Sequence, residues 1–189
     1  MTAAASPFTI AFLCTGNRFR SPLAAALLSA GTADLAVEAS SLGLLELGPV
    51  PALPEAIEMA ETLGVDVAAH RARDLAALDL EPLDLVVGFE RQHVRAAVVD
   101  GSAPIERTFT LPELVSLLES IPEPVSGPEP AEQARLRVAQ AHEQRPPGFR
   151  TASVPEIADP LGRPAREQRR IAEQLQELVG RLPGLLFSN

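Results

Sequence analysis

A cysteine and an arginine placed six residues apart indicate a site that binds an anion beside a nucleophile. Cys14 opens the segment CTGNRFRSP, and Arg20 follows six positions later. The arginine guanidinium offers a planar fork of N–H donors that fits two oxygens of a phosphoryl group. Backbone N–H groups that point into such a loop stabilise the thiolate form of the cysteine. This spacing therefore predicts attack of the Cys14 sulfur on a bound phosphoryl group.

The other residues of this segment suit a tight loop around an anion. Gly16 permits a backbone conformation that a side chain would forbid, and Asn17 tolerates a left-handed one. The Ser21 hydroxyl can donate a hydrogen bond to the sulfur, both as a thiolate and as a leaving group. The residues expected to bind phosphate are Thr15, Gly16, Asn17, Arg18, Phe19, Arg20 and Ser21.

The elements on either side of the segment are predicted to be a strand and a helix. Residues 8–13, FTIAFL, form an apolar run typical of a strand buried on both faces. After the segment, LAAALLSA favours a helix, with Pro22 in its first turn and Ser21 as its N-cap. A helix N-terminus adds its positive field to the loop. A buried structural cysteine beside a helix-capping serine is the alternative for Cys14 alone, and the combined spacing disfavours it.

The rest of the chain alternates between strand and helix patterns. Three further strands are predicted at residues 36–40, 83–89 and 107–110. Helices are predicted at residues 54–63, 90–99, 112–119 and 164–182. His93 and His142 fall in charged helical segments, and we expect both to face solvent. Because strands that alternate with helices favour a parallel sheet, we predict an α/β fold: a three-layer sandwich with a four-stranded parallel sheet and the phosphate loop between the first strand and the first helix.

Length and composition limit the classes of protein that need to be considered. The 189 residues favour a single domain, with a proline-rich and partly helical insert at about residues 121–155. Twenty-five acidic against 16 basic residues give a net charge of −9, which argues against nucleic acid or an anionic membrane as a partner. The chain has no long apolar run and no secretory signal pattern, so we expect a cytoplasmic protein. Cys14 is the only cysteine, which excludes a disulfide framework and a cysteine-rich zinc site.

The segment from Cys14 to Pro22 resembles the signature C-x-G-N-x-C-R-S-P, which lies near the N-terminus of the low-molecular-weight protein tyrosine phosphatases. Phe19 stands where that signature has its second cysteine. The resemblance covers roughly residues 7–120 and 156–187 and leaves the insert outside. It implies a cysteine-dependent phosphomonoester hydrolase of the protein tyrosine phosphatase type, which acts through a phosphocysteine intermediate and needs no metal and no other cofactor.

The resemblance also implies roles for residues outside the loop. The general acid of the family lies in an Asp-Pro pair before the C-terminal helix, which Asp159 and Pro160 match. Asp159 would protonate the leaving oxygen and then activate the water that hydrolyses the phosphocysteine. His70, in the segment HRAR, and Ser41 or Ser40, after the second strand, would support the phosphate loop from behind. The implied catalytic residues are Cys14, Arg20 and Asp159.

The residues around the predicted pocket differ from the family pattern. Leu161 follows the Asp-Pro pair where relatives have an aromatic side chain, and Leu44 or Leu45 stands where they often have a tryptophan. Arg18 lies at the pocket mouth, where an aliphatic residue or a threonine is usual. A cation there favours acidic or multiply phosphorylated substrates and repels a phosphoarginine guanidinium. We therefore expect phosphorylated proteins or small phosphomonoesters as partners, and a phosphate or sulfate ion in the site.

Three other functions remain open. The departures at the acid loop and the rim allow a protein that binds phosphate or a phosphoprotein with little turnover. A regulatory or interaction protein that uses residues 121–155 as a docking surface is the second. An arsenate reductase is less favoured, because those of this fold pass oxidation to additional cysteines and this chain has only Cys14.

Overall fold

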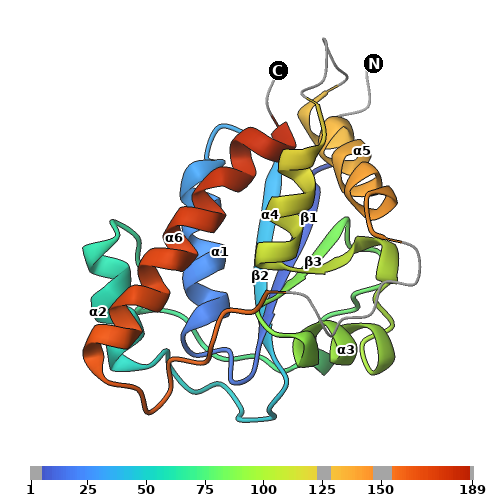
Figure 1. Ribbon diagram of the computed structural model, residues 1–189. Helices are drawn as coiled ribbons and strands as arrows, with labels where there is room; N and C mark the ends of the chain where they lie inside the picture. Colours follow the sequence, from blue (N-terminus) through green and yellow to red (C-terminus); the bar gives the residue numbers. More distant parts are fainter. Residues whose placement is uncertain (1–5, 123–128, 147–154, 188–189) are drawn as a thin grey trace.

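The inner strand β1 (Phe8–Cys14) carries the phosphate loop at its carboxyl end, and the sheet is built around it. Six of its seven residues are buried, as expected for a parallel strand with neighbours on both sides. In the computed structural model, which describes residues 6–122, 129–146 and 155–187, β1 pairs in parallel with β2 (Val37–Gly43) and β3 (Leu85–Gly88). β4 (Thr108–Thr110) pairs with β3, so the order is β2-β1-β3-β4 (Figure 1). The predicted four-stranded parallel sheet is confirmed.

Helices cover both faces of this sheet, which confirms the three-layer α/β sandwich. They are α1 (Arg20–Gly31), α2 (Pro54–Thr62), α3 (Arg91–Val99), α4 (Leu111–Ser120), α5 (Pro130–Glu143) and α6 (Ala165–Phe187), with the short 3₁₀ turns η1 (Leu75–Ala77) and η2 (Ile105–Arg107). Alternate residues of β1 point to opposite faces. Ile10 and Phe12 join the larger hydrophobic cluster, with α1, α4, α5 and α6, whereas Ala11 and Leu13 join a smaller one with α3. Cys14 belongs to the larger cluster and so lies on the side of α1 and α6.

The first helix begins earlier than predicted. α1 starts at Arg20, and Phe19 precedes it without a side-chain cap. The prediction that Ser21 is the N-cap is therefore wrong. Ser21 lies within the first turn and is fully buried, and its hydroxyl donates to the carbonyl of Leu42 at the end of β2.

The last helix continues past its predicted end at residue 182. Pro183 lies inside α6, although proline removes a helical hydrogen bond and usually ends a helix. The Pro183 ring packs against α1 at Gly31, where an added Cβ would lie 3.2 Å from its Cγ. Beyond it, the ring of Phe187 packs edge-on against Phe8, with the ring centroids 5.4 Å apart. Apolar burial in this last turn thus offsets the lost hydrogen bond.

Part of the predicted insert is a core helix. Along α5 the small apolar residues Ala134, Val138 and Ala141 are buried in the larger cluster. The Arg137 guanidinium donates to the carbonyls of Leu118, Pro122 and Leu185, and so joins α5 to the ends of α4 and α6. Residues 123–128 and 147–154 of the insert lie outside the described residues.

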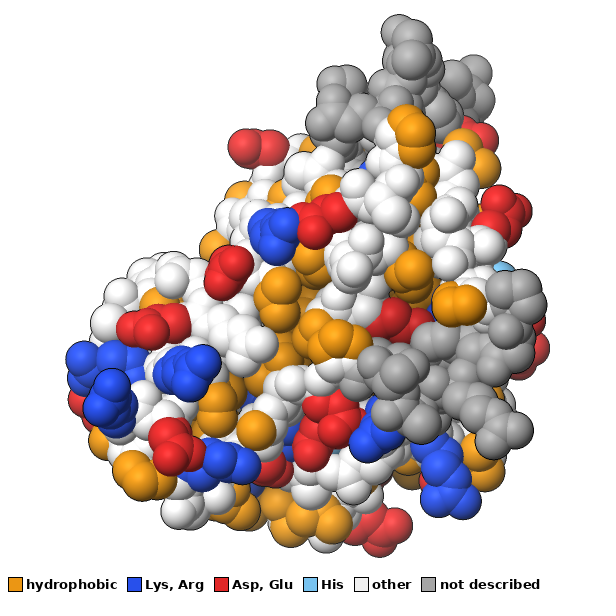
Figure 2. Space-filling view, viewed as in Figure 1, with side chains coloured by type: hydrophobic (Ala, Val, Ile, Leu, Met, Phe, Trp, Pro, Cys, Tyr) orange, Lys and Arg blue, Asp and Glu red, His pale blue; other side chains and the backbone are white. Residues whose placement is uncertain are grey.

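The described surface is mixed in charge. On the face shown in Figure 2, basic and acidic side chains are interspersed over α6. Arg163, just before this helix, forms an ion pair of 2.9 Å with Glu167 in its first turn. Among the described residues, no helix is both long enough and apolar enough to cross a membrane.

Candidate active site

The sulfur of Cys14 lies at the base of the loop between β1 and α1. Sγ accepts a hydrogen bond from the Asn17 backbone N–H, at 3.2 Å, and lies 3.0 Å from the Ser21 hydroxyl. Ser21 has two acceptors for its hydrogen, this sulfur and the Leu42 carbonyl at 3.2 Å. A negative charge on the sulfur therefore draws the Ser21 hydrogen toward it. Cys14 is a free cysteine and only 3% exposed.

The Asn17 side chain ties this loop to the strands behind it. Its Nδ2 donates to the hydroxyls of Ser21 and Ser41, both at 2.9 Å, and its Oδ1 accepts the N–H of Arg73 at 2.8 Å. The Asn17 carbonyl accepts a hydrogen bond of 2.7 Å from Nε2 of His70. Burial lowers the pKa of His70, and the nearby Arg73 adds to this. Ser41 and His70 are thus both brought to the loop through Asn17.

The structure separates the two serines that the sequence left as alternatives for this support. Ser41 contacts Asn17, whereas the Ser40 hydroxyl donates to the Ile10 carbonyl on the neighbouring strand. Successive residues of a strand point to opposite faces, which is why only one of the two can face the loop.

Of the two loop residues predicted to have an unusual backbone conformation, only Asn17 has one. Asn17 has a positive φ of 51°, as its residue type suggested. Gly16 is not in the left-handed region, and a Cβ there would meet only Leu47 at an ordinary 3.6 Å. The prediction that Gly16 needs to be glycine is therefore wrong. The close approach occurs at Gly43, at the end of β2, where a Cβ would lie 2.9 Å from the Asn17 nitrogen, and the sequence carried no signal for it.

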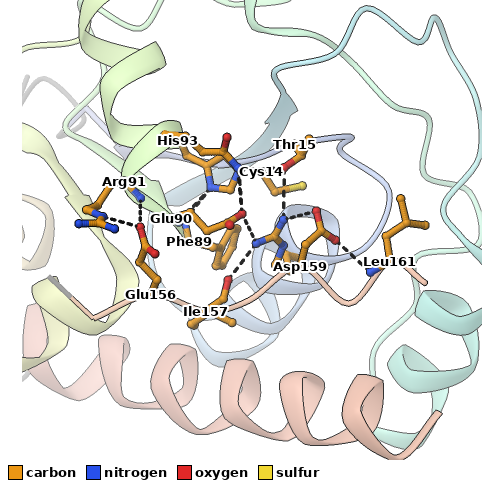
Figure 3. A network of polar contacts seen from close by, with 12 residues as sticks. Cys14, Thr15, Phe89, Glu90, Arg91, His93, Glu156, Ile157, Asp159 and Leu161 are labelled. Carbon is orange, nitrogen blue, oxygen red and sulfur yellow. Dashed lines mark hydrogen bonds and ion pairs between the residues drawn. The ribbon is translucent and has the colours of Figure 1, made fainter. Parts of the chain in front are cut away.

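The Arg20 guanidinium is buried and holds two carboxylates, those of Glu90 and Asp159, which Figure 3 labels. Nη1 donates to Glu90 Oε2 at 2.7 Å and to the Ile157 carbonyl at 2.9 Å. Nη2 donates to Asp159 Oδ2 at 2.6 Å and to the Thr15 hydroxyl at 3.3 Å. Asp159 thus reaches the loop from 139 positions further along the chain.

The segment that carries Asp159 is anchored to the start of α3. The Ile157 N–H donates to the Phe89 carbonyl at 2.8 Å. Glu156 Oε1 accepts from both the backbone N–H and Nε of Arg91, each at 2.8 Å. These hydrogen bonds hold the pKa of Glu156 below its usual value, with the backbone donor contributing most. α3 therefore positions Asp159 beside Arg20.

His93 was predicted to face solvent, and this prediction is wrong. The ring is fully buried between β3 and the site, where Nδ1 accepts the backbone N–H groups of Phe89 and Glu90. Burial, with a further contribution from Arg20, lowers the pKa of His93 to about 3. The polar sequence neighbours of His93 gave no indication of its burial. A signal was present in its spacing, because His93 and Ala97 share a helix face at i and i+4, and both are buried. His142, on α5, is partly buried, and its Nδ1 lies 3.4 Å from Nη1 of Arg145.

Aliphatic side chains surround the opening above Cys14. Leu45, Leu47 and Leu161 line this pocket and are 49%, 41% and 69% exposed. Leu44, the alternative to Leu45, packs instead against the smaller hydrophobic cluster. Arg18 also lines the pocket, and its Nε donates to the Pro51 carbonyl at 2.8 Å.

Phe19 contributes to the pocket wall from the core side. Its side chain is 4% exposed and lies in the larger hydrophobic cluster, yet it also lines the cavity above Cys14. The second cysteine of the family signature is thus replaced here by a core side chain. Within the described part of the chain, no group of three His, Cys, Asp or Glu side chains is placed to hold a metal ion.

Comparisons with family models, curated proteins and solved structures all match this chain to one family of phosphatases. The family model described as low molecular weight phosphotyrosine protein phosphatase matches residues 9–145. The match includes α5, which the sequence resemblance had left out, and stops before Asp159.

Two curated relatives differ in the substrate that their names give. A probable low molecular weight protein-tyrosine-phosphatase, EpsP from Ralstonia solanacearum, is 33% identical over 91 residues, which span 47% of this chain and 61% of EpsP. A protein-arginine-phosphatase from Geobacillus stearothermophilus is 32% identical over 123 residues, which span 65% of this chain and 82% of that protein.

Among solved structures, a low molecular weight protein tyrosine phosphatase from T. tengcongensis superposes with a TM-score of 0.69 at 26% identity, over 94% of this chain and 98% of that one. The family model covers most of the chain, and the strand, loop and helix that carry its signature have the geometry described above. This protein belongs to the low molecular weight phosphotyrosine protein phosphatase family.

Proposed function

We propose that this protein hydrolyses phosphomonoesters through a phosphocysteine at Cys14, with phosphotyrosine in proteins as its substrate. The observation that carries the proposal is the position of the Cys14 sulfur, 3.2 Å from the Asn17 N–H and 3.0 Å from the Ser21 hydroxyl, in the same pocket as Arg20. These donors favour a negative charge at the point where a phosphoryl group would be attacked. Cys14, Arg20 and Asp159 are the proposed catalytic residues.

In the first step the Cys14 thiolate attacks phosphorus in line with the leaving oxygen. The sulfur–phosphorus bond forms and the phosphorus–oxygen bond to the substrate breaks, while Arg20 and the loop amides hold the other phosphoryl oxygens. Asp159, 39% exposed and able to reach the pocket, gives its proton to the leaving oxygen. The product alcohol or phenol departs, and the enzyme carries the phosphoryl group.

In the second step water hydrolyses the phosphocysteine. The Asp159 carboxylate takes a proton from the attacking water, and the sulfur leaves as a thiolate. The Ser21 hydroxyl, 3.0 Å from the sulfur, stabilises this leaving group. Ser41 and His70 act indirectly, because their hydrogen bonds to Asn17 fix the loop in place.

The shape and charge of the rim support phosphotyrosine over phosphoarginine. The exposed leucines, Leu45, Leu47 and Leu161, can surround the faces of an aromatic ring. Arg18 places a cation beside the same opening, where it disfavours a second guanidinium and favours acidic residues next to the phosphorylated one. The names of the relatives include both a tyrosine and an arginine phosphatase, so the choice of phosphotyrosine for this protein rests on its rim.

Hydrolysis of p-nitrophenyl phosphate by the wild type and by Cys14→Ser tests the proposed chemistry. We expect turnover by the wild type and none by the variant. A second comparison uses one peptide sequence with either phosphotyrosine or phosphoarginine, and we expect the phosphotyrosine form to be preferred. A wild type that binds phosphate but hydrolyses none of these compounds is instead a phosphate-binding regulatory protein. Preference for the phosphoarginine peptide contradicts the substrate assignment and leaves the chemistry intact.

A further inference from the structure

The buried ring of His93 has a fixed arrangement of its single proton. Nδ1 accepts two backbone N–H groups, from Phe89 at 3.2 Å and from Glu90 at 3.0 Å, so it cannot carry a proton. The low pKa of about 3 keeps the ring neutral at neutral pH. A neutral imidazole has one N–H, which must therefore be at Nε2. His93 is a fixed hydrogen-bond donor beside the phosphate loop.

The nearest acceptor for this donor is the hydroxyl of Thr15. Nε2 lies 3.2 Å from Thr15 Oγ1, closer than the 3.5 Å to Glu90 Oε2. The same hydroxyl accepts a second hydrogen bond of 3.3 Å, from Nη2 of Arg20. A hydroxyl oxygen has two lone pairs and one hydrogen, so both lone pairs of Thr15 are engaged. Its hydrogen must then point in a third direction.

The side chain that carries this hydrogen belongs to the pocket over the Cys14 sulfur. Thr15 follows Cys14 directly, lines the same cavity and is partly exposed. Figure 3 shows the side chains of Thr15 and Cys14 next to each other. In the described part of the chain, Thr15 makes its side-chain hydrogen bonds to His93 and Arg20, and in both its oxygen is the acceptor. The hydrogen remains available to an oxygen of a bound ligand.

We propose that the Thr15 hydroxyl is a further donor to the phosphoryl group and that His93 is the positioning residue that aims it. The proposal rests on the proposed function of this site and adds a catalytic residue to it. When a phosphoryl group binds, it displaces Asp159 from Nη2 of Arg20, while Arg20 and His93 keep their hydrogen bonds to Oγ1. Without His93 the hydroxyl rotates freely, and part of its hydrogen bond to the phosphoryl oxygen is lost.

Substitutions at Thr15 test the donor itself. Thr15→Val keeps the shape and removes the hydroxyl, and Thr15→Ser keeps the hydroxyl. We expect Thr15→Val to lower kcat/KM for p-nitrophenyl phosphate and the affinity for inorganic phosphate about tenfold each, equivalent to about 1.4 kcal/mol. Thr15→Ser should restore most of both. Thr62→Val, an exposed threonine whose hydroxyl donates to the Glu58 carbonyl on α2, is the matched control and should change neither.

A double-mutant cycle tests the positioning role of His93. We expect His93→Phe to lower kcat/KM severalfold in the wild-type chain but to add little in the Thr15→Val background, since its effect passes through that hydroxyl. His93→Gln, which can both accept and donate, should recover part of the loss. If His93→Phe fails to fold, as a thermal melt would show, the Thr15 variants and His93→Gln still decide the proposal.

The outcomes separate this proposal from the proposed function. Equal kcat/KM and phosphate affinity in the wild type and Thr15→Val, with normal turnover, overturn the role of Thr15 and leave the phosphatase activity standing. If the wild type shows no turnover but Thr15→Val binds phosphate more weakly than the wild type does, the role of Thr15 stands and the phosphatase activity is overturned. Fully additive effects of His93→Phe and Thr15→Val show that His93 supports only the fold.

Discussion

The carboxylate of Asp159 forms an ion pair with the guanidinium of Arg20, with Oδ2 only 2.6 Å from Nη2. Nη1 is occupied by Glu90 and the Ile157 carbonyl, and the second hydrogen of Nη2 by Thr15. All four terminal hydrogens of this arginine are therefore matched to acceptors of the protein. A phosphoryl group that uses Nη2 has to displace Asp159 or Thr15. Binding of substrate thus competes with the ion pair and frees the carboxylate that is proposed to act as the acid.

This competition predicts that Asp159→Asn binds inorganic phosphate more tightly than the wild type. The amide removes one negative charge from Nη2, so the anion no longer displaces a carboxylate. We expect a gain of about tenfold in affinity, equivalent to about 1.4 kcal/mol. Isothermal titration calorimetry measures it, with Glu167→Gln, an exposed carboxylate on α6, as a control for net charge. Unchanged or weaker binding contradicts the competition.

Arg18→Ala should reduce the preference for acidic substrates. The Arg18 side chain lines the pocket and keeps one hydrogen bond, from Nε to the Pro51 carbonyl, which fixes the guanidinium near the mouth. We expect kcat/KM for an acidic phosphotyrosine peptide to fall about fivefold more than for a neutral aryl phosphate, equivalent to about 1 kcal/mol of lost attraction at a partly exposed site. Raising the salt concentration should reduce the difference between the two substrates. Identical losses for both substrates remove Arg18 from substrate selection.

His93 should make the protein less stable in acid. Its pKa of about 3 in the folded state lies below the value of 6.5 for an unperturbed histidine. The unfolded chain therefore binds more protons between these values, so the stabilisation is complete above about pH 6.5 and is lost as the pH falls. One such group contributes a slope of up to about 1.4 kcal/mol per pH unit.

Urea denaturation of the wild type and His93→Gln, at about pH 7 and about pH 5, measures this slope. The glutamine does not titrate, so the difference in unfolding free energy between the two proteins should shrink by about 2 kcal/mol at the lower pH. His70, whose pKa is also lowered, is present in both proteins and cancels. A difference that does not depend on pH shows that His93 is not held neutral in the folded state.

Peroxide should inactivate the protein in a way that reductant does not reverse. Cys14 is the only cysteine, and Phe19 occupies the place of the second cysteine in the family signature, so an intramolecular disulfide cannot form. An oxidised Cys14 is left to over-oxidation unless a small thiol is present. Cys14 is 3% exposed and lines the pocket, so saturating phosphate should protect its sulfur. Full recovery of activity with reductant after prolonged exposure contradicts this prediction.

The sequence predicted the sheet and the loop of the candidate site because both depend on local patterns. The apolar run that became β1 and the loop from Cys14 to Ser21 were readable from residue type and spacing, whereas Asp159 was singled out only through the family resemblance. Local boundaries were less reliable, because tertiary contacts decide them. Ser21 is not the predicted N-cap but contacts the Cys14 sulfur, and α6 continues beyond Pro183 because its last turn is buried.

The residues that the sequence failed to identify depend on contacts between distant segments. Gly43 matters because Asn17 packs against it, and nothing near Gly43 in the chain indicates this. His93 was misjudged because its sequence neighbours are polar, whereas its burial is set by β3 and the loop across from it. The pairing of Arg20 with both Asp159 and Glu90 likewise joins three segments whose proximity only the fold establishes.

The central claim is a covalent phosphocysteine at Cys14, and peptide mass spectrometry tests it most directly. Wild type and Asp159→Asn are mixed with an aryl phosphate that has a good leaving group, quenched in denaturant within one turnover and digested. We expect the peptide that contains Cys14 to gain the mass of one phosphoryl group on its sulfur. The modified fraction should be larger in Asp159→Asn, because the base that activates water is missing, and Cys14→Ala should show none. Hydrolysis of the substrate by the wild type with no phosphoryl group on Cys14 in either protein would contradict the account.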